Sequence, residues 1–227
     1  MPRYRHEYKY FLDSATESIL RTRADGFLMR DAHVQTDGTY YIRSLYFDDY
    51  HDSCAKENEA GTDPRSKFRI RYYNNDTSHI RLEKKSKTRG MTLKESCKLS
   101  PEECNIFLRG SIPQITEDMP AGKKKLLLEM QFRNLMPKVI VSYERIPYVY
   151  PGGNVRVTFD RNISSSADIA NFLEGTYISR PILPVGQSIL EVKWDEVIPL
   201  HIKNALALDH LQWTAFSKYY MCRVYHL

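Results

Sequence analysis

The chain has 227 residues, of which 42% are hydrophobic and 12% are aromatic. This composition can fill a packed core and excludes an intrinsically disordered chain. The formal net charge of +5 is compatible with an anionic ligand, but it does not identify one. No apolar run approaches the roughly 18–20 residues that span a bilayer, and the N-terminus lacks the apolar core of a signal peptide. We therefore expect a cytoplasmic protein without a membrane segment.

Several common motifs for binding phosphate or metal are missing from the sequence. It contains neither a G-x-x-x-x-G-K-[ST] loop nor a G-x-G-x-x-G turn, and its seven histidines form no H-E-x-x-H motif. The four cysteines include no C-x-x-C pair, so we expect free thiols. Any phosphate chemistry must therefore use other side chains.

The N-terminal half predicts strands separated by short helices. Residues 4–12 alternate charged and aromatic side chains, as a strand does. Ser14 and Glu17 then have the spacing of a capping box at the start of a helix. The segments 74–76 and 89–90 have the composition of hairpin turns. Further strands are expected at 39–47, 66–73, 79–87 and 91–99, with a helix at 51–60.

The C-terminal half continues the same alternation of elements. Ser100, Pro101 and Glu103 predict a helix start, and a second helix is expected at 122–135. Strands are expected at 138–149, 154–162 and 187–194, followed by helical pieces within 198–223. Many strands without a βαβ rhythm predict a mainly antiparallel α+β fold, which we assign to a single domain over residues 1–227.

Five predicted strands repeat one pattern of charged, apolar and charged residues. Because successive side chains of a strand point to opposite faces, each of these strands gathers its polar side chains on one face. Arg, Lys and Glu are unusually frequent on these faces. The positions are Arg5, Glu7 and Lys9; Lys67, Arg69 and Arg71; Arg81, Glu83 and Lys85; Arg156, Thr158 and Asp160; and Glu191 and Lys193.

Two architectures fit this pattern. An open sheet could present one charged face to solvent. Alternatively, the sheet could close into a barrel with its charges inward and its apolar side chains outward, beneath the helices. A charged lumen would need an anionic ligand, because burying unpaired charge is costly. The alternation by itself does not choose between them, although the composition of the faces favours the barrel slightly.

A lumen of this kind suits a linear chain of phosphates. Arg binds phosphate oxygens with two parallel hydrogen bonds, and Lys supplies a point charge. A carboxylate among these cations is best explained as a ligand of Mg²⁺ or Mn²⁺, which bind oxygen and bridge to phosphate. Phosphoryl transfer would then require mainly positioning and stabilisation of charge.

Eight segments, in their order and spacing, resemble the triphosphate tunnel metalloenzymes. Within that group they resemble the VTC domain of the vacuolar transporter chaperone polyphosphate polymerases. The resemblance runs from Arg5 to Tyr219 and implies a closed triphosphate-tunnel β-barrel with helices packed outside. The segments are RHEYK at 5–9, SLYFD at 44–48, KFRIR at 67–71, LEKK at 82–85, YER at 143–145, RVTFD at 156–160, LEVK at 190–193 and FSKY at 216–219.

The resemblance also implies roles for individual residues. Lys94, Lys193 and Ser217 would add contacts to the substrate. Glu191 would hold Mn²⁺ or Mg²⁺, with Glu7 and Glu83 as helpers. From the residues alone, Lys193 could equally be a charge partner of Asp160, and the segment 44–48 indicates packing and a turn. The cations expected to contact phosphates are Lys9, Arg69, Arg71, Lys85, Arg145, Arg156 and Lys218.

The activity implied by the resemblance is transfer of the ATP γ-phosphoryl group to a growing inorganic polyphosphate chain. Arg5 stands where other branches have the first Glu of E-x-E-x-K, which favours the polymerase branch over the adenylate cyclase and thiamine triphosphatase branch. The SPX domain and membrane anchor of the eukaryotic polymerases are not in this sequence.

Two other functions remain open. A tripolyphosphatase or nucleoside triphosphatase would use the same cations, with water as the attacking group. A non-catalytic module could bind polyphosphate or nucleic acid. We expect no nucleic acid, because the aromatic side chains lie opposite the cations and could not stack on bases.

Overall fold

In the computed structural model, residues 5–32 and 34–226 are described. The predicted strand at 4–12 begins at residue 4, which lies outside these residues. The helices are α1 (Ser14–Phe27), α2 (Ser53–Glu59), α3 (Pro101–Leu108), α4 (Ala121–Phe132), α5 (Leu200–Ala205) and α6 (Lys218–Val224). The strands are β1 (His6–Leu12), β2 (Met29–Arg30), β3 (Tyr40–Asp48), β4 (Arg65–Tyr73), β5 (Asp76–Thr88), β6 (Met91–Leu99), β7 (Met136–Tyr150), β8 (Val155–Ser166), β9 (Arg180–Pro181) and β10 (Ser188–Trp194).

The main strands follow one another in the order β1-β10-β8-β7-β3-β4-β5-β6, while β2 pairs with β7 and β9 pairs with β8. The registers within this sheet are antiparallel, which confirms the mainly antiparallel α+β fold. β1 and β6 stand at the two ends of this order. Among the described residues no pairing joins them, so hydrogen bonds do not complete the ring of the predicted closed barrel.

Local signals in the sequence account for most element boundaries. Asn74 and Asn75 have φ of 53° and 59° in the β4–β5 turn, as the favoured two-residue hairpin turns require. The capping box at Ser100 and Glu103 is confirmed. The capping box predicted at Ser14 is wrong, because Asp13 is the N-cap of α1 and accepts a hydrogen bond from the Thr16 backbone N–H at 2.7 Å.

The chain divides into two compact units. Unit 1 comprises the chain up to Tyr41, Tyr143–Ile163 and Leu183–Phe216, and unit 2 comprises Ile42–Ser142, Ser164–Ile182 and the chain from Ser217 onward. The long strands β7 and β8 each contribute residues to both units. The single domain expected over residues 1–227 stays a prediction.

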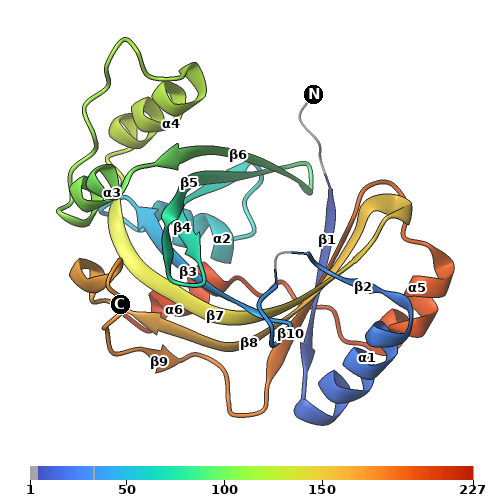
Figure 1. The fold of residues 1–227 in the computed structure, drawn as a ribbon. Helices are drawn as coiled ribbons and strands as arrows, with labels where there is room; N and C mark the ends of the chain where they lie inside the picture. Colours follow the sequence, from blue (N-terminus) through green and yellow to red (C-terminus); the bar gives the residue numbers. More distant parts are fainter. Residues whose placement is uncertain (1–4, 33, 227) are drawn as a thin grey trace. The chain divides into compact units, whose positions relative to one another are not determined.

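The core of unit 1 lies on the apolar face of β1, β8 and β10, where α1 and α5 cover the strands (Figure 1). Leu20 and Ala24 come from α1, and Ile202 and Leu206 come from α5. They pack with the strand residues Tyr10, Leu12, Val155, Val157, Phe159, Leu190 and Val192. The helices therefore cover the apolar face, as the alternation predicts.

The core of unit 2 repeats this arrangement on β4 and β5. Phe107 of α3 and Leu127 and Met130 of α4 are fully buried in it. They pack against strand residues from the predicted apolar face, namely Phe68, Ile70, Tyr72, Ile80 and Leu82. In both units the apolar face is thus buried beneath helices, and the charged face points away from them.

Candidate phosphate-binding clusters

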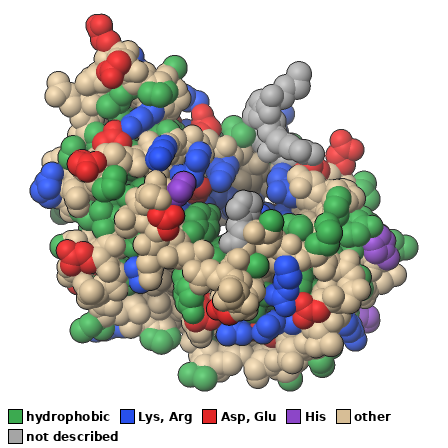
Figure 2. Space-filling model, in the orientation of Figure 1, with side chains coloured by type: hydrophobic (Ala, Val, Ile, Leu, Met, Phe, Trp, Pro, Cys, Tyr) green, Lys and Arg blue, Asp and Glu red, His purple; other side chains and the backbone are tan. Residues whose placement is uncertain are grey.

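The charged face of unit 2 brings like charges side by side across three strands. Lys67 of β4 lies opposite Lys85 of β5, and Lys85 lies opposite Lys94 of β6. We call these three residues the lysine row. A second row places Arg71 opposite Arg81, which in turn lies opposite Lys98. Figure 2 shows Lys and Arg side chains gathered over the area where Figure 1 draws β5 and β6. Like charges directly opposite one another destabilise a sheet.

Glu83 lies between these two rows, on the same face of β5. Its carboxylate accepts a hydrogen bond from Arg69 Nε at 2.8 Å and lies 2.6 Å from Arg69 Nη2. Lys94 Nζ donates to the other carboxylate oxygen at 3.0 Å. Glu83 is 1% exposed. This buried carboxylate therefore holds the Arg69 guanidinium and the Lys94 ammonium on the same face.

The pKa values of nearby groups report a positive potential on this face. Burial by itself would raise the pKa of Tyr46, but Arg69 and Arg71 outweigh it and lower the pKa. The pKa of Tyr73 is lowered in the same way, against burial, mainly by Arg71. Burial would also raise the pKa of Glu83, yet Arg69, Arg71 and Lys94 lower it strongly. Three acidic groups are thus stabilised in their charged form by the surrounding cations.

Further polar contacts orient the remaining cations of unit 2. Arg71 Nε donates to Ser44 Oγ at 2.9 Å, and Arg69 Nη1 donates to Tyr46 OH at 2.9 Å. Lys67 Nζ donates to Ser217 Oγ at 2.8 Å. Ser217 also caps α6, whose first residue is Lys218. Lys67 was not among the predicted site residues, although it shares their strand face. The predicted site residues that belong to unit 2 are Arg69, Arg71, Glu83, Lys85, Lys94, Ser217 and Lys218.

The charged face of unit 1 is built differently, around a buried ion-pair group. Arg145 of β7 makes two parallel hydrogen bonds to Asp160 of β8, at 2.6 and 2.7 Å. Its Nη2 also donates to Glu191 of β10 at 3.2 Å. Arg145, Asp160 and Glu191 are 7%, 0% and 4% exposed. We call these three residues the Arg145 group.

Negative charges dominate the electrostatic surroundings of Arg145, whereas positive charges dominate the charged face of unit 2. Burial would lower the pKa of Arg145, but Asp160, Tyr143 and Glu191 outweigh it and raise the pKa further above its ordinary value. The carboxylates around this guanidinium therefore stabilise the cation, whereas the cations of unit 2 stabilise anions.

The neighbouring residues of β1 and β10 extend this pairing of opposite charges. Lys193 Nζ contacts Glu191 and lies 3.8 Å from Glu7 Oε2. Lys9 Nζ lies 3.2 Å from Glu7 Oε1 and donates to the Phe216 carbonyl oxygen at 3.0 Å. Lys193 thus contacts the carboxylates of Glu7 and Glu191, and Arg145 binds Asp160.

Arg156 of β8 completes the predicted set in unit 1. Its Nη2 lies 2.7 Å from Asp31 Oδ2 and donates to Tyr40 OH at 2.5 Å. Lys9, Arg145, Arg156, Lys193, Glu7 and Glu191 therefore belong to unit 1. The structure thus divides the predicted site residues between two clusters, one in each unit.

Burial of the charged faces bears on the choice between a solvated sheet and an enclosed one. Arg71, Glu83, Arg145 and Glu191 are all less than 9% exposed, although they carry charge. Buried charges are normally paired or bind a ligand. These positions do not have the exposure expected of a face that merely solubilises a sheet.

Carboxylates in unit 1 could provide oxygen ligands for a divalent cation. The Lys193 ammonium contacts both Glu7 and Glu191, so these two carboxylates already share one positive charge. Mg²⁺ is commonly bound by one or two carboxylates together with substrate phosphates. Within residues 5–32 and 34–226, no three His, Cys, Asp or Glu side chains are grouped so that they could hold a metal ion. Glu7 and Glu191 therefore fit the smaller donor set, in which phosphate supplies further oxygen ligands.

The segment 44–48 contributes to the charged face of unit 2 as well as to packing and a turn. Leu45 and Phe47 are buried in the core, and Asp48 accepts hydrogen bonds from the backbone N–H groups of Cys54 and Ala55 at the start of α2. That agrees with packing and a turn. Ser44 and Tyr46 alternate with these residues and contact the arginines of β4. Their alternation with Leu45 and Phe47 was a signal that they share the charged face.

The four cysteines all lie among the described residues and are free thiols, as expected. Burial raises the pKa of Cys104 to about 12. Within the same part of the chain, no helix is long and apolar enough to cross a membrane.

The fold resembles those of several solved structures. A candidate adenylyl cyclase of Hippeastrum, described as having a dominant triphosphatase activity, aligns with a TM-score of 0.56 and 14% identity, covering 100% of this chain and 97% of that chain. A candidate adenylate cyclase of Bacillus halodurans aligns with a TM-score of 0.52 and 14% identity, covering 91% of this chain and 88% of that chain. A candidate adenylate cyclase of Vibrio parahaemolyticus aligns with a TM-score of 0.51 and 9% identity, covering 97% of this chain and 98% of that chain. At these identities the likeness shows only that the folds are similar.

The sequence itself identifies the family more narrowly. It matches the family model of the VTC domain over residues 4–225. No curated protein sequence matches it. The chain therefore belongs to the VTC domain family, as the order of its segments indicated.

Proposed function

We propose that this protein is a metal-dependent polyphosphate polymerase, which transfers the γ-phosphoryl group of ATP to a growing polyphosphate chain. Membership of the VTC domain family supports this activity, and we propose that residues 1–227 act as one such domain. A basic tunnel around the substrate is part of the proposal. Because the reaction would consume ATP, we place it in the cytoplasm.

The single observation that carries the proposal is the lysine row together with Arg69 and Arg71. Adjacent cations across a sheet weaken it, and the lowered pKa of buried Tyr46 reports their combined potential. A linear anion lying across these strands would remove the repulsion and gain charge-assisted hydrogen bonds. Polyphosphate carries one or more negative charges at each phosphate, so it matches a repeated array of cations better than a single small anion does.

The residues of the chain would act mainly by positioning. Arg69, Arg71, Lys85 and Lys218, with Lys94 and Ser217, would bind phosphates at unit 2. Lys9, Arg145 and Arg156, with Lys193, would do so at unit 1, where the Arg145 group keeps its guanidinium in a fixed orientation. Fixed cations of this kind stabilise the charge that spreads over the transferred phosphoryl group without reorganising during the reaction.

Glu191 and Glu7 would hold Mn²⁺ or Mg²⁺, and Glu83 would act as a helper by fixing Arg69 and Lys94. The bound cation would neutralise charge on the phosphate oxygens. Binding would require Lys193 to give up its contacts to the two carboxylates, and the released ammonium would then be available to a phosphate.

Product analysis tests the reaction class. Purified protein is incubated with ATP and Mn²⁺, and long polyphosphate is separated on a gel while orthophosphate is measured in parallel. We expect long polyphosphate to accumulate. Release of orthophosphate alone would contradict the polymerase and support a triphosphatase, the activity described for the Hippeastrum protein of similar fold.

Glu191→Gln separates an enzyme from a binding module. The substitution keeps the shape of the side chain but removes a carboxylate that would hold the metal. We expect turnover to fall roughly 100-fold, while the affinity for tripolyphosphate without metal changes little. Glu144→Gln, at a partly exposed carboxylate that pairs with Arg161, serves as the control. Full activity of Glu191→Gln would contradict the metal assignment, and an inactive wild-type protein that binds polyphosphate would indicate a binding module.

A further inference from the structure

A polar pocket lies on the other face of the unit 2 strands, away from the charged face. Ser66 of β4 and Lys84, Ser86 and Thr88 of β5 line it. Ser66, Lys84 and Ser86 are each offset by one position from Lys67, Glu83 or Lys85, and Thr88 is three positions from Lys85. Successive side chains of a strand point to opposite faces, so an odd offset places all four on the other face. The pocket is therefore separate from the lysine row, although the same two strands build both.

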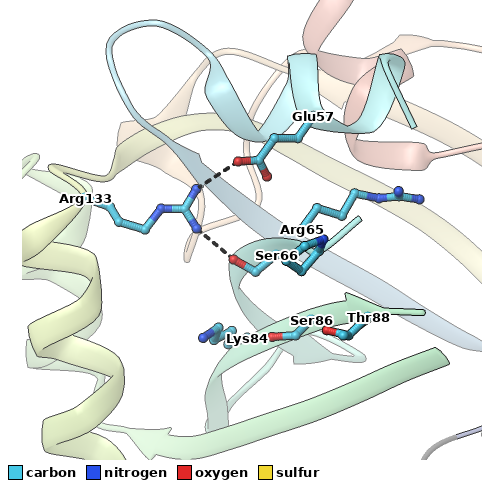
Figure 3. Close-up of a pocket in the computed structure, with 8 residues that line it drawn as sticks. Glu57, Arg65, Ser66, Lys84, Ser86, Thr88 and Arg133 are labelled. Atoms are coloured by element: carbon cyan, nitrogen blue, oxygen red, sulfur yellow. Dashed lines mark hydrogen bonds and ion pairs between the residues drawn. The ribbon is translucent and has the colours of Figure 1, made fainter. Parts of the chain in front are cut away.

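The pocket has a volume of about 280 Å³, and cations and hydroxyls supply most of its lining. Arg133 follows α4 and donates from Nη1 to Ser66 Oγ at 2.7 Å, so the Ser66 hydroxyl proton is directed elsewhere. Figure 3 shows Arg133 between Glu57 and Ser66, with a contact to each of them. Ser86 and Thr88 lie on the neighbouring strand. Ser66 and Ser86 lie directly opposite each other in the ladder. Three hydroxyls and two guanidinium groups thus offer hydrogen-bond donors.

Carboxylates near the pocket hold the cations in place. Lys84 Nζ donates to Glu129 at 2.6 Å and lies 3.9 Å from Glu95, and Arg133 Nη2 lies 3.9 Å from Glu57 Oε1. The third cation, Arg65, donates from Nη1 to the Thr62 carbonyl oxygen at 2.6 Å. Because acidic groups offset much of the positive charge, a highly charged polyanion is a poor match for this pocket. A small anion with hydrogen-bonding capacity suits it better.

One atom of the lining distinguishes between small anions. The second carboxylate oxygen of Glu57, Oε2, is buried and has no hydrogen-bond partner within residues 5–32 and 34–226. A buried acceptor without a donor costs roughly 1–3 kcal/mol. The terminal torsion of Glu is soft, so a small rotation would turn this oxygen towards a ligand. That ligand must bring a donor, because a carboxylate repels a fully deprotonated anion.

We propose that this pocket binds inorganic orthophosphate, as a second site separate from the charged strand face. Orthophosphate at neutral pH keeps at least one P–OH group, which would donate to Glu57. Its other oxygens would accept from Arg133, Arg65 and the hydroxyls of Ser66, Ser86 and Thr88. Sulfate has no proton to donate, and a phosphate monoester is largely a dianion without one above its second pKa of roughly 6. The site would therefore respond to free orthophosphate in the presence of other phosphates.

Calorimetric titration of the full chain at pH 7.5 tests the site with orthophosphate, sulfate and methyl phosphate as probes. We expect orthophosphate to bind more tightly than the other two. Ser86→Asp places a carboxylate in the pocket at a partly exposed position, and we expect it to weaken orthophosphate binding roughly tenfold or more. Ser111→Asp adds the same charge at an exposed loop residue outside the lining and serves as the control.

Glu57→Gln provides the second test, because its amide can donate to sulfate. We expect this variant to lose the preference for orthophosphate over sulfate, while urea unfolding confirms that it is folded. Equal binding of orthophosphate and sulfate by the wild-type protein would overturn the proposal. So would unchanged orthophosphate affinity in folded Ser86→Asp. Neither substitution replaces a residue of the lysine row, and Ser86 points to the opposite face from Lys85. Polymerase activity can therefore fail or persist independently of this result.

Discussion

In unit 2, Lys67, Lys85 and Lys94 lie side by side on three neighbouring strands, and the buried phenol of Tyr46 has a lowered pKa. In unit 1, Lys193 lies between Glu7 and Glu191, and the pKa of Arg145 is raised by the acidic groups around it. Both faces arise from the same alternation of charged and apolar residues. The two faces differ in whether a charged side chain lies opposite a like or an opposite charge in the adjacent strand. The sequence of a single strand does not specify its neighbour in the sheet.

This difference gives the two clusters different electrostatic properties. Unit 1 balances its own charges in a buried network, and such a network is stable only while every member keeps its partner. Unit 2 accumulates positive potential at a cost in stability, and an anionic ligand would offset that cost.

The largest effect is expected from reversing the charge of unit 2. Arg69→Glu combined with Arg71→Glu should weaken tripolyphosphate binding roughly 10,000-fold, because two charge-assisted hydrogen bonds are lost and two repulsive charges are added. Calorimetric titration measures the affinity. Arg89→Glu combined with Arg109→Glu changes the net charge equally at exposed positions and should have little effect. Retained affinity in the first variant would contradict a phosphate site at this cluster.

Breaking the Arg145 group should affect folding before it affects binding. Asp160→Asn leaves the Arg145 guanidinium buried without its two strong acceptors, so we expect the free energy of unfolding to fall by about 3–5 kcal/mol. Urea denaturation measures it. Glu144→Gln removes a partly exposed pair with Arg161 and should cost less than about 1 kcal/mol. Equal decreases in the free energy of unfolding for Asp160→Asn and Glu144→Gln would contradict a stabilising role of the Arg145 group beyond that of a partly exposed ion pair.

A substitution in the lysine row should raise the stability of the protein and weaken its binding of phosphate. Lys85→Gln removes the central cation, and relief of repulsion should raise the free energy of unfolding without phosphate by about 0.2–1 kcal/mol. The same substitution should weaken tripolyphosphate binding roughly tenfold. Both quantities are compared with wild-type protein in low-salt buffer. A variant that loses stability as well as affinity would show that the row is not repulsive.

The smallest effect concerns two buried phenols, one in each unit. The pKa of Tyr46 is lowered by Arg69 and Arg71 against the effect of burial, so it should ionise earlier than an ordinary tyrosine. Burial and a hydrogen bond to Asp25 raise the pKa of Tyr148 to about 12. In an alkaline titration followed by ultraviolet absorbance, Tyr46→Phe should remove signal below pH 10, whereas Tyr148→Phe should remove it only near pH 12.

The sign of the stability change follows from the same shift in Tyr46. A phenol whose folded pKa lies below its unfolded value stabilises the folded state as the pH rises through the interval between them. Tyr46→Phe should therefore remove a stabilising contribution that appears towards pH 10 and is absent at neutral pH. Loss of stability at neutral pH alone would point to the packing of Tyr46 against Tyr219 instead.

The sequence by itself determined which side chains share a face. Period-two alternation placed Lys67, Arg69 and Arg71 together and put Phe68 and Ile70 beneath helices, because strand geometry is local. The turn at Asn74 and Asn75 and the cap at Ser100 were predictable for the same reason. The family was also readable, from the order of short segments that carry charge at fixed spacing.

The tertiary structure decided which residues face one another across strands. Register is set by long-range pairing, so the lysine row, the Arg145–Asp160 pair and the position of Lys193 between Glu7 and Glu191 do not follow from any one segment. The short strands β2 and β9 have two residues each and carry no pattern of their own. The pocket at Glu57 and Arg133 likewise exists only because α2, the end of α4 and two strands meet. Charge on a strand is a local property, but whether that charge is paired, repelled or available to a ligand depends on its neighbours in space.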